Sequence, residues 1–218
     1  MTGAGLLGLV APLIGAGLFV AGGAATAEAR LPKKDPAFAS SANDPILIAR
    51  IAALSPTIDQ AEAQLVTQTA YTTGQDFKRE WKVVWPPGVQ NFLVNTGRRK
   101  GGLCFQWATE LLIRLHALKL QTIEMHWAEA FPRTASEHNV IVVTAKSQPF
   151  TQGIILDNWR YGGRLVWGPV TGDPHYEWKE NPREIPKRLD RFAPRAAPSA
   201  SEARSRPQPR VPTTPAAR

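Results

Sequence analysis

The hydrophobic period changes once along the chain, and this change most constrains its fold. Apolar residues recur at helical spacing in two stretches, TIDQAEAQLVTQTAYTTGQDF (57–77) and CFQWATELLIRLHAL (104–118). Four short segments rich in β-branched and aromatic residues follow: LQTIEMHWAEAF, HNVIVVTAK, GIILDNWR and GRLVWGPV. Helices followed by successive strands predict an α+β fold with an antiparallel sheet against a helix, and they argue against an alternating βαβ sheet.

The regions around these segments are predicted from their breakers and caps. Asp44 and the pair Ser55-Pro56 can each open an early helix. Residues 81–102, WKVVWPPGVQNFLVNTGRRKGG, are predicted as a loop region because they contain two consecutive prolines and end in two glycines. The folded domain is therefore predicted to span residues 44–192, which is enough chain for one domain.

The two ends differ from this domain in composition. Residues 1–29 hold an apolar run, then small residues and an A-x-A site, which is typical of a cleavable signal peptide. The alternative for this segment is an uncleaved N-terminal anchor, and residues 30–43 are predicted as a linker. Residues 193–218 contain six prolines and one valine as their only large apolar residue, which predicts a disordered tail. We expect an exported protein, periplasmic or secreted, or held at the membrane by the anchor.

The net charge of +8 is concentrated near the C-terminus. Residues 183–218 carry nine Lys/Arg and three Asp/Glu, so +6 of the excess lies there and the body is only mildly basic. We therefore expect no specific nucleic-acid binding. The basic tail is predicted either to contact anionic envelope polymers or to remain a solvated end without a particular partner.

Cys104 is the only cysteine, which excludes an intramolecular disulfide and a thiolate metal cluster. It lies at the start of the second helical stretch, where unpaired backbone N–H groups and the helix dipole favour a thiolate. Arg98, Arg99 and Lys100 act in the same direction. The alternative is a buried apolar cysteine, which is the commoner state of a free thiol.

Two residues on successive predicted strands favour the reactive alternative. His138 opens the strand HNVIVV, from which it can act as a general base toward the thiol. Asp157 ends the next apolar strand, where an acid requires a partner. If the two strands are neighbours, Asp157 can orient the imidazole and stabilise its cation. Taken alone, Asp157 also suits a turn cap.

The order Cys, His, Asp and the sequence around each residue resemble the bacterial transglutaminase-like cysteine proteases of the papain-like superfamily. The resemblance covers about residues 80–170 and rests on VVWPPGVQNFL, GGLCFQWATELLIRL and EHNVIVVTAKSQPFTQGIILDNWRYGGRLVWGPV. It implies a papain/transglutaminase-like fold, with the nucleophile helix packed on an antiparallel β-sheet. It also implies Cys104 as nucleophile, His138 as base and Asp157 as the orienting acid.

The resemblance further implies a cysteine hydrolase that cleaves an envelope or surface protein. The residues themselves indicate only acyl transfer at an amide or ester. Two alternatives stay open: a peptidoglycan peptide hydrolase or amide transferase of the same fold, and a non-enzymatic binding module of the envelope.

Further site residues are expected near the cysteine. Trp107, one turn along the helix, can wall the site, and Gln90, Asn91 and Asn95 are oxyanion donor candidates from the upstream segment. No histidine pair has metal-ligand spacing, so we predict no metal and no cofactor. Calcium, which some family members bind through acids beside the cysteine, is an analogy only, because those acids are missing here.

Overall fold

The computed structural model describes residues 42–192, so the predictions for residues 1–29, for the linker as far as residue 41 and for residues 193–218 lie outside the described residues. The early elements are helices: α1 (Pro45–Ala52), α2 (Gln60–Glu80), α3 (Pro87–Asn95) and α4 (Cys104–Ala117). The strands follow: β1 (Ile123–Ala130), β2 (His138–Ala145), β3 (Ile154–Tyr161), β4 (Arg164–Pro169) and β5 (Lys179–Glu180). The helix α5 (Glu184–Phe192) ends the described chain.

The strands form one antiparallel sheet in the order β4-β3-β2-β1-β5. The four strands predicted from the sequence are its first four, and the two predicted helical stretches form α2 and α4. The expectation of an α+β fold with a helix against an antiparallel sheet is thus confirmed.

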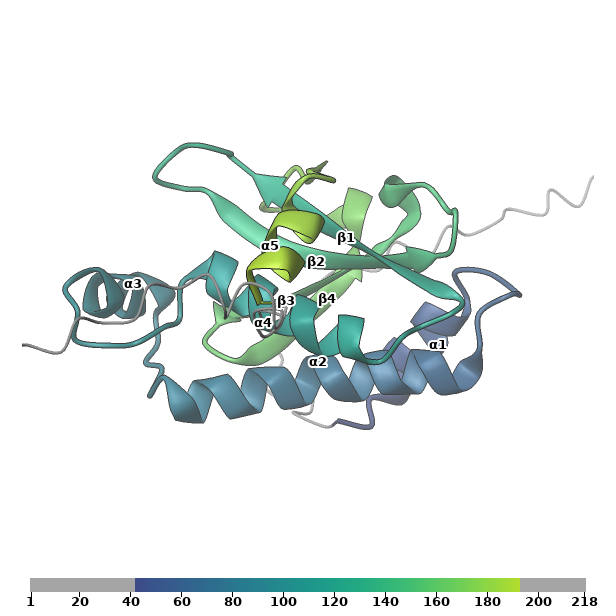
Figure 1. Ribbon diagram of the computed structural model, residues 1–218, viewed down its shortest axis with the longest axis horizontal. Helices are drawn as coiled ribbons and strands as arrows, with labels where there is room; N and C mark the ends of the chain where they lie inside the picture. Colours follow the sequence, from purple (N-terminus) through teal and green to yellow (C-terminus); the bar gives the residue numbers. More distant parts are fainter. Residues whose placement is uncertain (1–41, 193–218) are drawn as a thin grey trace, which may run out of the picture.

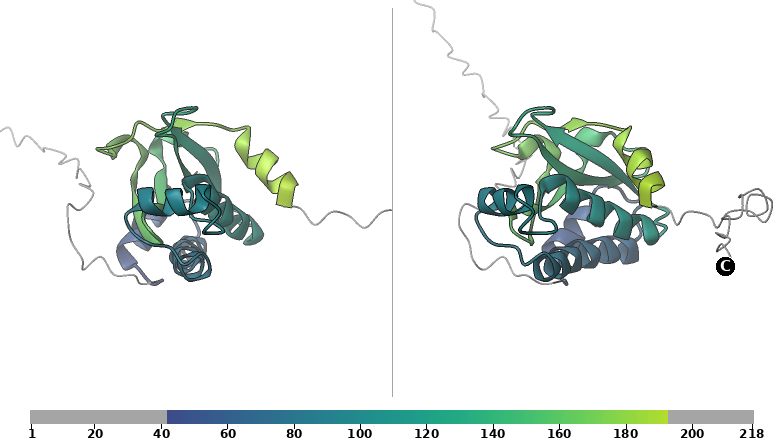
Figure 2. Two further views of the ribbon diagram at one scale, coloured as in Figure 1. Left: turned by 90° about the vertical axis from the view of Figure 1, so that its left-hand side faces the viewer. Right: turned by 60° about the vertical axis from the view of Figure 1, so that its left-hand side comes forward.

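One face of the sheet is covered by helices (Figure 1). The apolar side of α4 packs on β2 and β3, and α2 packs on α4. Figure 2 shows this layering end-on, with α5 standing at the β1 side of the sheet. The main core lies here, and its largest side chains come from α1, α4 and the inward face of the sheet: Leu47, Ile51, Leu111, Leu112, Leu115, Trp127, Ile141 and Leu156.

The opposite face of the sheet is covered by the chain that follows β4. Its smaller core includes Val140 and Val142 of β2, Ile155 of β3, and Trp178. His138 and Asp157 belong to this face by strand alternation, because they lie two residues from Val140 and Ile155. The predicted pairing of β2 with β3, seen in Ile141↔Leu156, therefore places both side chains on the same side of the sheet.

Two helices differ from the expectation for their segments. The loop predicted for residues 81–102 contains α3, because Pro87 lies at the start of the helix, where a missing N–H costs nothing. Val89 and Phe92 are exposed, so the apolar residues of α3 do not follow the helical spacing that marks a face turned to the core. The helix α5 was not predicted either; it tolerates Pro186 because that residue lies in its first turn.

Asp44 joins three elements at one end of the main core. Its Oδ1 accepts hydrogen bonds from the backbone N–H groups of Ile46 and Leu47, at 3.0 and 3.1 Å, and so caps α1. Its Oδ2 accepts from the Tyr71 hydroxyl at 2.7 Å and the Trp167 indole at 3.2 Å. Of the two helix starts expected from the sequence, the one at Asp44 is formed.

We expect Asp44→Ala to lower the free energy of unfolding by about 2–4 kcal/mol, because it removes a cap and leaves the buried Tyr71 hydroxyl and the half-buried Trp167 indole without an acceptor. Urea denaturation measures the change. Asp59→Ala is the matched control, since exposed Asp59 caps α2 through a single bond to Ala61 N. The control should cost only about 1 kcal/mol. Equal costs for the two variants would contradict this role of Asp44.

No helix within residues 42–192 has the length and apolar character needed to cross a lipid bilayer.

Candidate active site

Cys104 is the first residue of α4, and the chain before it is shaped to start the helix there. Gly102 has a φ of +124°, a conformation that side-chain-bearing residues rarely adopt. The Gln106 side chain turns back, and its Oε1 accepts from the N–H groups of Gly102 and Leu103, both at 3.0 Å. The backbone N–H of Cys104, at the first position of α4, has no acceptor within the helix. Cys104 is half-buried, so it is not enclosed in the core as an apolar cysteine would be.

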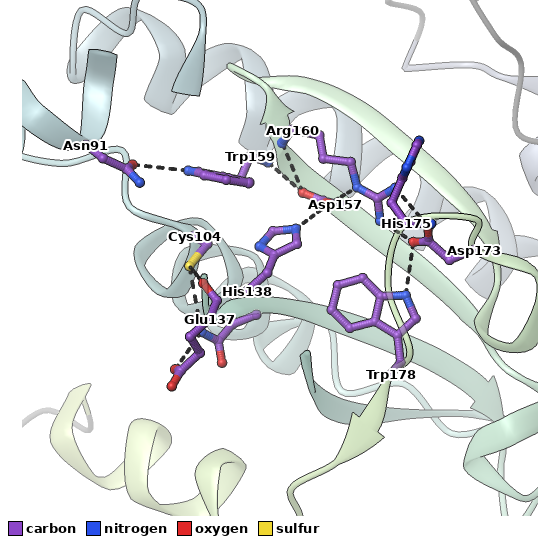
Figure 3. Close-up of polar contacts among 11 residues, drawn as sticks. Asn91, Cys104, Glu137, His138, Asp157, Trp159, Arg160, Asp173, His175 and Trp178 are labelled. Carbon is purple, nitrogen blue, oxygen red and sulfur yellow. Dashed lines mark hydrogen bonds and ion pairs between the residues drawn. The ribbon is translucent and has the colours of Figure 1, made fainter. Parts of the chain in front are cut away.

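The His138 imidazole lies between the Cys104 sulfur and Asp157 (Figure 3). Its Nε2 is 2.7 Å from Oδ2 of Asp157, and both side chains are only 1% exposed. Its Nδ1 is buried and has no hydrogen-bond partner among the described residues. Figure 3 shows this nitrogen on the side of the ring that faces Cys104. Since a carboxylate only accepts, the neutral ring carries its proton on Nε2 and directs the Nδ1 lone pair to the sulfur side.

Three aromatic rings hold the imidazole in this orientation. The ring centroids of Trp159, Tyr176 and Trp178 lie 4.6, 4.8 and 5.4 Å from that of His138. Trp159 follows Asp157 on β3, whereas the other two belong to the chain after β4. The packing leaves the ring few alternative rotamers, so its nitrogens remain directed at the sulfur and the carboxylate.

Asp157 accepts four hydrogen bonds. Its Oδ1 accepts from the backbone N–H groups of Trp159 and Arg160, at 2.8 and 3.3 Å. Its Oδ2 accepts from His138 Nε2 and from Arg160 Nε, the latter at 2.8 Å. Asp157 lies within β3, directly after its apolar residues, and it can be fully buried there because its charge is paired and its oxygens are hydrogen-bonded.

Arg160 extends the network to a second buried carboxylate. Its Nη1 and Nη2 donate to both oxygens of Asp173, and its guanidinium lies 4.6 Å from the centre of the Tyr176 ring. Asp173 also accepts from the Trp178 indole at 3.0 Å and from the His175 backbone N–H at 3.0 Å. The segment after β4 is thus tied to the same charges that orient the imidazole.

The electrostatics of this network favour a charged imidazole. Burial lowers the pKa of His138, but the charge and hydrogen bond of Asp157, together with Cys104, raise it to about 9. Burial raises the pKa of Asp157, but His138 and then Arg160 outweigh it and lower this pKa to about 2. Imidazolium beside carboxylate is therefore the stable pair at neutral pH.

The raised pKa of His138 predicts how stability depends on pH. The imidazolium stabilises the fold fully below about pH 6.5, the value of an unfolded histidine, and this contribution is lost as pH rises through about 9. We expect the melting temperature of the wild type to exceed that of His138→Gln by several degrees at pH 6. The difference should shrink by pH 10, and a difference that grows with pH would contradict the assigned charge state.

The other residues expected at the site have different positions. Trp107 is 2% exposed and packs edge-on against Trp81, so it supports the core behind α4 instead of walling a cleft. Gln90 is 1% exposed; its amide donates to Gly101 O at 2.7 Å and accepts from Val84 N at 3.1 Å. Gln90 therefore holds the chain before Cys104. Its amide donates to Gly101 and does not point to an oxyanion, so its contacts do not support a role as oxyanion donor.

The two asparagines of α3 lie apart from these contacts. Asn91 Oδ1 accepts from the Trp159 indole at 3.3 Å, which links α3 to a ring that packs on His138. Asn95 is exposed near the end of α3. Neither has a hydrogen bond to Cys104 or His138 within residues 42–192.

Sequence reasoning missed several residues of the network. Asn139 donates from Nδ2 to Cys104 Sγ at 3.7 Å, and its position next to His138 was the only signal for it. Arg160 is three residues from Asp157, a spacing that carries no meaning on a regular strand. Asp173, Tyr176 and Trp178 lie in the chain after β4, whose path no local pattern predicts.

Two cavities flank the site. One, of about 410 Å³, is lined by Asp173, Tyr176 and Trp178, which back the imidazole. The other, of about 480 Å³, lies between α5 and the chain joining β1 to β2, and Glu137 and Asn139 line it beside the sulfur. This second cavity adjoins the sulfur only through Glu137 and Asn139, because Cys104 and His138 are not among its lining residues.

Within the described part of the chain, no group of three or more His, Cys, Asp or Glu side chains is arranged to hold a metal ion.

Comparison with known proteins leaves the chain without an assigned relative. No family model matches it, and no curated protein or solved structure matches it.

Proposed function

We propose that the protein is an exported, papain-like cysteine hydrolase of the transglutaminase-like type, acting on amide bonds of an envelope or surface protein. The observation that carries the proposal is the His138 imidazole, whose Nε2 is bonded to Asp157 while its buried Nδ1 faces Cys104 without a partner. A merely structural buried histidine would be expected to have both nitrogens bonded.

The mechanism begins from a Cys104 thiolate and a His138 imidazolium. The sulfur attacks the carbonyl carbon of the scissile amide, and the oxygen that becomes negative accepts from the Cys104 backbone N–H at the start of α4. His138 gives its Nδ1 proton to the amide nitrogen, the C–N bond breaks, and an amine leaves. Asp157 holds the ring and stabilises its cation during this step.

The thioester is then hydrolysed by the same residues. Water attacks the thioester carbon while His138 Nδ1 accepts one of its protons. The C–S bond breaks, the carboxylic acid leaves, and the thiolate and imidazolium are restored. An amine in place of water would give amide transfer through the same intermediate.

The proposal is tested by mapping new protein N-termini. Envelope fractions from cells making the full-length wild type or Cys104→Ala are labelled at free amines and analysed by mass spectrometry. We expect new internal N-termini in one or a few envelope proteins with the wild type only. Identical sets of termini in the two samples would overturn the proposal of a protein substrate.

The same cultures separate the alternatives. Peptide fragments released from purified sacculi by the wild type alone would assign peptidoglycan as substrate, and incorporation of a labelled amine would assign amide transfer. A phenotype retained by Cys104→Ala would assign a binding module. Contact of the basic tail with anionic envelope polymers remains a prediction for residues 193–218.

A further inference from the structure

The Cys104 sulfur also contacts the chain at the start of β2. The thiol donates to the Glu137 carbonyl oxygen at 3.5 Å, and Asn139 Nδ2 donates to the sulfur at 3.7 Å. Ionisation of the thiol removes the first of these bonds and leaves a carbonyl oxygen facing an anion. The Asn139 amide is the neutral donor that can offset this repulsion.

The orientation of the Asn139 amide is fixed by two other partners. The Trp127 indole, which can only donate, gives its N–H to Asn139 Oδ1 at 3.0 Å. Asn139 Nδ2 also donates to Oε1 of the Glu137 carboxylate, which can only accept, at 3.1 Å. With the oxygen on the indole, the nitrogen must face the sulfur. Asn139 is also 4% exposed, so water does not readily replace this donor.

Strand alternation explains how two neighbouring residues reach one sulfur. The side chains of His138 and Asn139 leave opposite faces of β2, and Asn139 shares its face with α4. Because α4 begins beside the start of β2, the sulfur lies within reach of the Asn139 amide as well as beside the imidazole. The His138 imidazole can therefore transfer protons while the Asn139 amide donates to the Cys104 thiolate.

On the basis of the proposed function, we propose that Asn139 is a further catalytic residue, which stabilises the Cys104 thiolate by donating a hydrogen bond to it. The residue touches the reacting atom itself. Its partners Trp127 and Glu137 act as positioning residues, since they hold the amide with its nitrogen toward the sulfur.

Other groups around the sulfur set the background for a test. His138 and the Glu137 carboxylate are the titratable groups from the β2 side, and Tyr176 comes from the chain after β4. Burial raises the pKa of Tyr176, so its hydroxyl stays uncharged. On α5, Arg188 lies over the Trp127 ring at 4.1 Å. Asn139 is neutral, so replacing it by leucine removes a donor without changing the charge of the site.

The test is the rate of Cys104 alkylation by iodoacetamide as a function of pH, with full-length Asn139→Leu. This reagent reacts with the thiolate and forms no oxyanion, so it reports the thiolate alone. We expect the midpoint of the profile to move up by roughly one pH unit, with a rate about tenfold lower at acidic pH. Asn158→Leu is the control: Asn158 is a buried amide on β3 that bonds to Ala70 O, and its loss should leave the midpoint in place.

Asn139→Leu leaves the Trp127 indole without its acceptor and could prevent folding. A second variant keeps the proposal testable in that case. Asn139→Asp keeps an acceptor and places a carboxylate near the sulfur, so it should raise the midpoint further. An unshifted midpoint in whichever variant folds would overturn the role of Asn139.

His138→Gln, measured in parallel, separates the two proposals. If His138→Gln moves the profile and Asn139→Leu does not, the Asn139 inference fails and the proposed function stands. If neither variant moves it, the thiolate assignment itself fails.

Discussion

Replacing Cys104 by alanine is expected to lower the rate of amide hydrolysis by at least about 10⁴-fold. The substitution removes the only nucleophile in the proposed mechanism and leaves His138 and Asp157 without an atom to activate. The thiol is partly exposed, so its loss should change the free energy of unfolding by less than about 1 kcal/mol. Steady-state rates on the identified substrate, with urea denaturation of the same samples, give both quantities.

The control for this variant is His116→Ala. His116 lies on the same helix, is exposed, and is remote from the helix start. It should retain wild-type rates. Hydrolysis by Cys104→Ala at more than a tenth of the wild-type rate would place the chemistry elsewhere.

Replacing Asp157 by asparagine is expected to lower the rate by about 10³- to 10⁴-fold. The carboxylate accepts at both oxygens, from two backbone N–H groups on one and from His138 and Arg160 on the other. An amide has one oxygen, so in either orientation its NH₂ faces two donors. If the backbone bonds are kept, the His138 proton is driven from Nε2 to Nδ1, where the neutral ring can no longer accept a proton from the thiol side.

The same substitution should also destabilise the fold, by about 3–5 kcal/mol, because it breaks a buried ion pair. Asp190→Asn, an identical change at an exposed position on α5, is the control and should alter neither rate nor stability. Stability is followed by urea denaturation, and the rate on the identified substrate is measured below the transition. A fully stable Asp157→Asn with wild-type activity would contradict the role of this network.

The part of the site that the sequence predicted is the part that local patterns determine. The helical period after two glycines places Cys104 at a helix start, and the alternation of HNVIVV and GIILDNWR places His138 and Asp157 on one face of adjacent strands. These are properties of consecutive residues. They fold as the patterns indicate because each face of β2 and β3 packs against its own core, and a slip of one residue would exchange the two sets of side chains.

The residues that were missed depend on distant partners. The link from Arg160 to Asp173 could not be predicted, because it depends on the path of the chain after β4, which brings Asp173 within hydrogen-bond distance. Asn139 faces the sulfur only because Trp127, on the neighbouring strand, holds its oxygen. The helix α3 was not predicted, because it begins at two prolines and because its apolar residues Val89 and Phe92 are exposed. Gln90 and Trp107 were assigned to the substrate from their nearness in sequence, whereas their contacts hold the chain that presents Cys104.

The central claim is that Cys104 and His138 form a thiolate–imidazolium pair, and the most direct test is the pH profile of alkylation in wild type and His138→Gln. A single cysteine makes the label unambiguous by intact mass. We predict that the wild type alkylates several-fold faster than His138→Gln at about pH 6 to 7, because the imidazolium stabilises the thiolate that reacts. His116→Gln should match the wild type. Profiles that coincide for wild type and His138→Gln would contradict the account.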